Sequence, residues 1–168
     1  MDRILTYCSI GDDYKFKWQQ KQDGKLWENR ALVSVELPDP DLKKAYERFA
    51  FAVQAIFGFR GTALEVVPNI IHITAISMER KDKFGVDMRL VKMNASIYLS
   101  SICAEAKIST PKVYEDFSDV LINGITFSRL LDDLERECFK YIDGCRAQQV
   151  LNFEEATKMA EEAKERAE

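Results

Sequence analysis

The chain has 168 residues, of which 46% are hydrophobic and 31% are charged. This length and composition predict a globular protein with one main domain, large enough to bury a core without disulfides or metals. The formal net charge of −4 argues against a dedicated duplex-DNA binder, which usually has a basic domain. It leaves room for a local basic surface, because binding follows the local field.

The sequence carries no segment typical of secretion or membrane insertion. The N-terminus lacks an apolar signal sequence, and the longest apolar run, residues 49–59, is shorter than the roughly 20 residues that span a bilayer. The 4 cysteines have no C-x-x-C spacing, and the chain has 1 histidine, so no metal site or redox pair is indicated. We therefore expect a cytoplasmic protein with reduced cysteines, no cofactor and no membrane partner.

The first third of the chain predicts three strands followed by a helix. Residues 5–10 and 14–20 have strand character, and Asp23-Gly24 is typical of a tight hairpin turn before a third strand over 26–37. Alternation along this third strand places apolar residues on one face. They are Trp27, Ala31, Val33, Val35 and Leu37.

Residues 39–58 predict a helix with both ends marked. Asp39 is a natural N-cap, Pro40 suits the first helical position, and Gly58 can adopt the left-handed conformation that ends a helix. From Phe49 onward the helix is apolar on nearly every side. A helix of this kind must be covered on all sides, so we expect it at the centre of the core or in a subunit contact.

The rest of the chain predicts a second run of strands and then further helices. Strands are expected over 63–67, 70–78 and 86–93, and a short helix over 114–122. Residues 97–108 fit either a strand or a helix, and the downstream Pro111 favours the strand. Two helices follow, over 126–146 and 152–167, and the second of these is acidic.

Strands and helices are therefore segregated along the chain, which predicts an α+β fold with a mostly antiparallel sheet. The strands fall in two runs, at about 2–37 and 63–108, and pack on the helices 39–58 and 126–146. We expect a single domain over 1–148 and a helical arm over 149–168.

Catalytic motifs are not evident. His72 lies in a strand as His-x-Thr, which resembles one half of the motif of two-histidine phosphoesterases. That chemistry needs a second histidine to pair an acid with a base, and His72 is the only one. We expect His72 on the polar face of a strand and assign no catalytic residue. A carboxylate-held metal enzyme is a lesser alternative, for which Asp12, Asp13 and His72 would be tested first.

A ribbon of aromatic and basic residues supports a second hypothesis, binding of single-stranded nucleic acid. If the aromatic rings share an exposed face, they can stack on bases while lysines follow the phosphates. The basic turn around residues 80–92 could add a second edge. The simpler interpretation packs the rings on the central helix and points the lysines to water. The ribbon residues are Tyr14, Lys15, Phe16, Lys17, Trp18, Lys21, Lys25 and Trp27.

The helix 126–146 supports the leading hypothesis, a protein-interaction surface. Apolar residues recur four and three apart along it, as in a heptad seam, although a helix laid on a sheet shows a similar stripe. Excess apolar surface would mark self-association or a protein partner. The seam residues that we expect at this surface are Phe127, Leu131, Leu134 and Tyr141.

The leading prediction is thus a non-enzymatic accessory protein that acts through a protein partner or by self-association. Single-stranded nucleic-acid binding through the ribbon is the alternative. A compact chain with few motifs would suit a phage or mobile element, although no residue supports this context directly.

Overall fold

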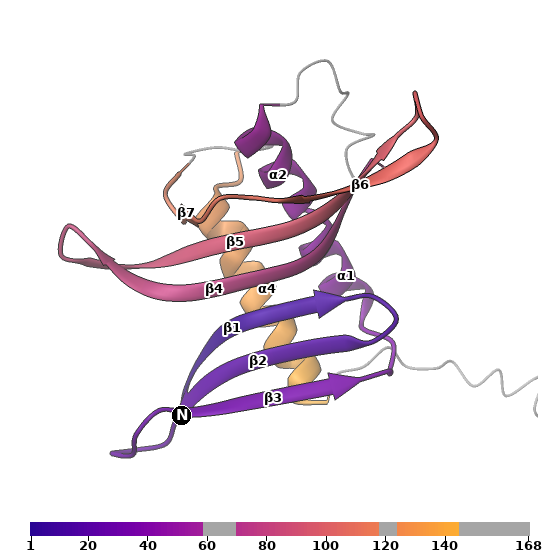
Figure 1. Ribbon diagram of the computed structural model, residues 1–168. Helices are drawn as coiled ribbons and strands as arrows, with labels where there is room; N and C mark the ends of the chain where they lie inside the picture. The colour runs from indigo at the N-terminus through magenta and orange to yellow at the C-terminus, as the bar shows by residue number, and fades with distance from the viewer. Residues whose placement is uncertain (59–69, 118–123, 145–168) are drawn as a thin grey trace, which may run out of the picture.

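The computed structural model describes residues 1–58, 70–117 and 124–144, and shows the predicted α+β fold. A seven-stranded antiparallel sheet has the order β3-β2-β1-β4-β5-β6, with β7 paired to β5. The helices lie on one face of the sheet (Figure 1). The elements are β1 (Asp2–Ile10), β2 (Tyr14–Lys21), β3 (Glu28–Ser34), α1 (Pro40–Glu47), α2 (Phe49–Phe57), β4 (Ile71–Lys83), β5 (Val86–Leu99), β6 (Ala104–Ser109), β7 (Val113–Tyr114) and α4 (Phe127–Ile142).

The predicted strands of the first third are confirmed, with shifted ends. β1 and β2 form an antiparallel pair, and β2 pairs with β3 across the expected turn at Asp23-Gly24. β3 is shorter than the expected strand over 26–37. The apolar face expected on it is exposed, because its odd-numbered residues lie on the side of the sheet away from the helices.

The second half is built around a long β4–β5 hairpin, which turns at Phe84-Gly85. Residues 97–108 are not one continuous strand, because a turn over 100–103 separates β5 from β6. The helix expected over 114–122 is wrong at its start, where Tyr114 belongs to β7 and a turn follows. The strand expected over 63–67 and the acidic helix over 152–167 lie outside the described residues, as does the arm over 149–168.

The helix expected over 39–58 is present but bent, as α1 followed by α2. The Asp39 carboxylate accepts a hydrogen bond from the Asp41 N–H at 2.9 Å, and Gly58 takes the predicted left-handed conformation with φ 63°. The bend lies at Arg48, where the Phe51 N–H donates to the Arg48 carbonyl at 3.2 Å, a tighter step than the α-helical one. The bend separates the amphipathic α1 from the strongly apolar α2.

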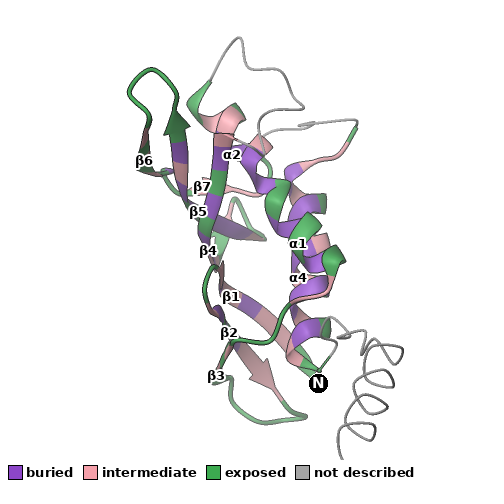
Figure 2. Ribbon diagram, turned by 90° about the vertical axis from the view of Figure 1, so that its right-hand side faces the viewer, coloured by how far each residue is buried: buried purple, intermediate pink, exposed green. Residues whose placement is uncertain are grey.

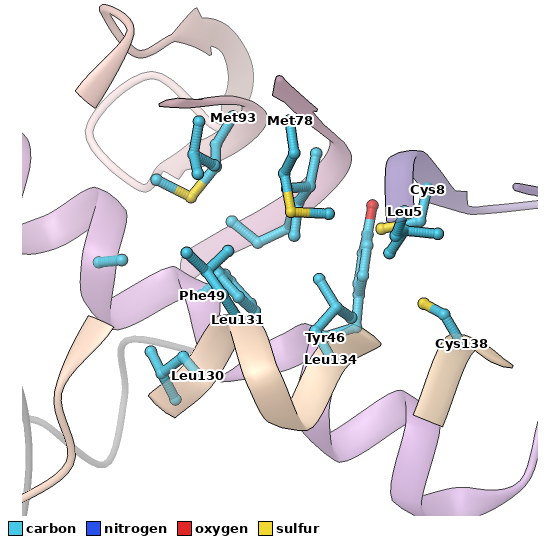
Figure 3. Packing of buried hydrophobic residues seen from close by; sticks show 14 of the residues in the cluster. Leu5, Cys8, Tyr46, Phe49, Met78, Met93, Leu130, Leu131, Leu134 and Cys138 are labelled. Atoms are coloured by element: carbon cyan, nitrogen blue, oxygen red, sulfur yellow. The ribbon is translucent and has the colours of Figure 1, made fainter. Parts of the chain in front are cut away.

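The core lies between the sheet and the helices. Thr126 caps α4 by accepting a hydrogen bond from the Arg129 N–H at 3.2 Å. The apolar side of α4 faces the sheet. Figure 3 shows α4 leucines opposite Met78 and Met93 of the sheet. Cys138 packs there as a small apolar residue, and burial together with its neighbour Cys8 raises the pKa of its thiol.

A narrow junction joins the two halves of the sheet. β1 and β4 pair only at Tyr7–Ser77 and Cys8–Ile76, whereas β4 and β5 pair along nearly their whole length. Each strand has a register shift beside this junction, in β1 before Tyr7 and in β4 after Ile73. Irregularities of this kind bend a strand and increase its twist. The halves therefore diverge on both sides of the junction (Figure 1).

Candidate functional site

The sheet has one face covered by helices and one face on which none of the described helices lies. Figure 2 shows α1, α2 and α4 on the same side, and no described helix on the other. Alternation along the strands decides which side chains reach this open face. In β5, for example, Val91, Met93 and Ala95 are buried toward the helices, while Lys92 and Asn94 are exposed on the open face.

Basic residues collect on the open face although the whole chain is acidic. Lys15 and Lys17 come from β2, Lys92 from β5 and Lys107 from β6, and all four are exposed. Lys15 lies 3.2 Å from an Asp13 carboxylate oxygen. The other three form no ion pair with any described residue, so their charges are available to a ligand.

One row of residues crosses the junction between the halves. The strand registers align Lys17 with Tyr7, Tyr7 with Ser77, and Ser77 with Lys92. Adjacent strands are about 4.8 Å apart, so the two lysine Cα atoms of this row are separated by roughly 14 Å. The Lys17 Nζ also lies 5.6 Å from the centre of the Tyr7 ring. The half-buried Tyr7 ring thus lies beside Lys17, and Lys92 lies two strands away on its other side, beyond Ser77.

A second aromatic residue lies further along the same face. Tyr98 of β5 keeps 45% of its surface exposed and is paired in register with Glu105 of β6. Lys107 lies opposite Ser96, two residues before Tyr98 on the same side of the strand. The open face therefore carries two accessible tyrosines with lysines nearby. We call Tyr7, Lys15, Lys17, Lys92, Tyr98 and Lys107 the lysine–tyrosine face.

The structure corrects the aromatic half of the ribbon hypothesis. Tyr14, Phe16 and Trp18 are buried against the helices, at 8%, 0% and 9% exposure, and cannot stack on a ligand in this arrangement. The alternation places their rings inward and Lys15 and Lys17 outward, which is the simpler of the two predicted arrangements. Of the other ribbon residues, Trp27 and Lys25 are exposed near the hairpin turn, and Lys21 is half-buried at the end of β2.

The predicted second basic edge is mostly neutralised. Arg89 is buried on the helix side, Lys83 binds Asp116 at 2.7 Å, and Arg80 lies 3.7 Å from Asp87. Only Lys92 of that set belongs to the lysine–tyrosine face. The sequence alone did not show that Lys92 is free of ion pairs with described residues while the nearby basic residues are not.

The seam predicted as an interaction surface is core instead. Phe127, Leu131, Leu134 and Tyr141 are at most 1% exposed. They pack on the sheet, and the Tyr141 hydroxyl donates a hydrogen bond to the Glu36 carbonyl at 2.6 Å. These residues are unavailable to another protein while the chain is folded, so the named surface is wrong.

The residues considered for catalysis are not assembled into a site. His72 is exposed on the open face opposite Ser96, as expected for a polar strand position. Asp12 and Asp13 lie in the β1–β2 turn. Among the described residues, no three histidine, cysteine, aspartate or glutamate side chains are grouped closely enough to hold a metal ion.

The length of the helices and a comparison with known proteins give two further findings. Within residues 1–58, 70–117 and 124–144, none of the helices is long and apolar enough to cross a membrane. Comparison of the chain with protein-family models, with curated proteins and with solved structures gave no match. The lysine–tyrosine face is therefore the feature of the described structure that bears most directly on function.

Proposed function

We propose that this protein binds single-stranded nucleic acid, DNA or RNA, on the lysine–tyrosine face. The observation that carries the proposal is the row in which Lys17 and Lys92 flank Tyr7 across four adjacent strands. Single-strand-binding surfaces combine aromatic rings, on which bases stack, with basic side chains along the phosphate path. The row provides both kinds of side chain on a face that none of the described helices covers.

The distribution of charge supports this assignment. The chain has 28 acidic and 24 basic residues, yet Lys17, Lys92 and Lys107 on the open face have no carboxylate partner in the part of the chain that the structure describes. Many carboxylates are instead on α1 and α4, on the other side of the sheet, where they engage local cations. A polyanion would thus be attracted to one face of an otherwise acidic molecule.

The leading prediction, action through a protein partner or self-association, stays a prediction after loss of its expected surface on α4. The apolar seam of α4 does not support this prediction, because its residues are buried against the sheet. The edge of β3 is a different surface of the sheet.

The test is fluorescence anisotropy with labelled single strands of about 20 nucleotides, longer than the roughly 4–16 nucleotides that a small binding module covers. The logarithm of the affinity should fall with the logarithm of salt concentration, with a slope of about −0.7 for each phosphate contacted. The triple variant Lys17→Gln, Lys92→Gln, Lys107→Gln should weaken binding and make this slope shallower by about 2.

A matched control removes the same kind of charge from the helix side. Lys43 and Lys44 are exposed on α1, so Lys43→Gln and Lys44→Gln should leave affinity and slope almost unchanged. Tyr7→Leu should cost about 1–3 kcal/mol of binding, the contribution of one stacked base. Absence of binding to both DNA and RNA would refute the proposal, as would equal losses for the open-face and α1 variants.

A further inference from the structure

β3 forms one edge of the sheet, and no described residue pairs with its outer side (Figure 1). Unpaired N–H and C=O groups along such an edge are a template for another strand. Large apolar side chains are exposed on β3 and directly beside it. They are Leu26 at 88%, Trp27 at 44%, Val33 at 62%, Val35 at 78% and Leu37 at 62% exposure.

The opposite edge of the sheet has a different character. β6 exposes Glu105 and Lys107, alternating with half-buried residues, and charges of this kind discourage pairing between edges. β3 also exposes two charged residues, Glu28 and Arg30, but they have opposite signs, and Val33 and the flanks of the strand are apolar. An apolar, unpaired edge on a small protein marks a contact with another chain.

The sequence of β3 is complementary to itself. In an antiparallel pair with a two-fold axis beside Asn29, Glu28 of each copy lies opposite Arg30 of the other. Both side chains are about half exposed, and within one chain they already lie 2.7 Å apart. Extended to the two residues that precede β3, the same register places Trp27 opposite Ala31, and Leu26 opposite Leu32. Opposite charges and apolar groups therefore meet across the axis.

From this complementarity we infer that two copies of the chain associate through β3, edge to edge, to form one continuous sheet. A two-fold axis perpendicular to the sheet keeps both open faces on the same side. The contact is isologous, since the same residues serve in each copy. The inference stands without the proposed nucleic-acid binding, because none of the β3 residues belongs to the lysine–tyrosine face.

Charge reversal provides the test, with sedimentation velocity and light scattering over a range of protein concentrations. The unaltered chain should form dimers. Glu28→Arg places like charges opposite each other twice per dimer, and Arg30→Glu does the same, so each should weaken association about tenfold or more. The double variant, Glu28→Arg with Arg30→Glu, restores opposite charges and should recover dimerisation.

A matched control distinguishes the effect of charge reversal at the β3 edge from the effect of charge reversal elsewhere on the surface. Lys43 and Glu47 form an exposed ion pair on α1 at 3.9 Å, so Lys43→Glu should not change the dimer. Circular dichroism of each variant verifies that the fold is retained. A chain that stays monomeric at every concentration would overturn the inference. A dimer that persists in both single variants, or that the double variant does not recover, would assign the contact elsewhere and overturn it too.

Discussion

Three hydrogen bonds join the Glu115 carboxylate to Arg89. The Arg89 Nε and Nη2 donate to Glu115 Oε2 at 2.8 and 2.6 Å, and the Arg89 backbone N–H donates to Oε1 at 2.9 Å. The same guanidinium also reaches Asp132 at 2.7 Å and Glu135 at 3.2 Å on α4. This buried arginine therefore ties β5 to α4 and to the segment after β7.

Replacing Arg89 with methionine should destabilise the fold by about 3–5 kcal/mol, as expected when one partner of a buried ion pair is removed. The remaining carboxylates would be close together without their common cation. Urea unfolding followed by circular dichroism measures the loss. The control is Arg129→Met, because Arg129 is 67% exposed and lies 3.5 Å from Asp133. Equal stability of the two variants would show that the ion pairs of Arg89 do not stabilise the contact between β5 and α4.

Two carboxylates of this cluster should respond to pH in opposite directions. Burial would raise the pKa of Glu115, but its hydrogen bonds with the Arg89 backbone and guanidinium outweigh this and hold the pKa below 4.5. Burial of Glu135 raises its pKa above 4.5, although Arg89 and Arg80 oppose the shift. The stability from Glu115 is therefore present above pH 4.5 and lost as pH falls through the lowered value.

The Glu135 contribution has the reverse sign, because the folded state holds this proton more tightly than the unfolded chain does. Stability should fall as pH rises from 4.5 through the raised pKa of Glu135. Urea unfolding measured from about pH 3 to about pH 7 distinguishes the Glu115 contribution to stability from the Glu135 contribution. The advantage of the unaltered chain over Glu115→Gln should shrink toward low pH, while Glu135→Gln should gain relative stability toward neutral pH. Parallel curves for the two variants would contradict both assignments.

The helix seam provides a direct test of its place in the core. Leu134 is fully buried on α4, so Leu134→Ala should cost about 2–5 kcal/mol of unfolding free energy. Ile102 is 66% exposed in the turn before β6, and Ile102→Ala serves as the control with little expected change. Thermal and urea unfolding measure both. A small loss at Leu134, with a change in oligomeric state, would return the seam to the role of an interaction surface.

Local signals in the sequence were sufficient for the helix ends and the strand alternation. Asp39, Gly58 and Thr126 perform the capping roles that their residue types predict, because capping depends on a few neighbouring backbone groups. The bend at Arg48 was missed, since no proline or glycine marks it. The burial of Arg89 was also missed, because its carboxylate partners lie 26 to 46 residues away in the sequence.

The candidate site depended on pairing that no local pattern reports. The alternation in β2 showed that aromatic residues and lysines occupy opposite faces, but it could not decide which face the helices cover. Tyr7 lies between Lys17 and Lys92 because the short β1–β4 junction pairs it with Ser77. Alternation along residues 26–37 placed the apolar residues on one face, but it could not show that this face is exposed or that β3 lies at an edge of the sheet.

The 2 tryptophans of the chain report on opposite environments and can test the arrangement of the ribbon directly. Trp18 is buried at 9% exposure, with its Nε1–H donating to Gln20 Oε1 at 3.2 Å, whereas Trp27 is 44% exposed. Trp27→Phe leaves Trp18 alone and should emit at shorter wavelength than Trp18→Phe. In the Trp18→Phe variant, emission should shift to shorter wavelength as protein concentration rises, because pairing through β3 covers Trp27. Matching spectra at low concentration would mean that the ribbon does not face the helices as described.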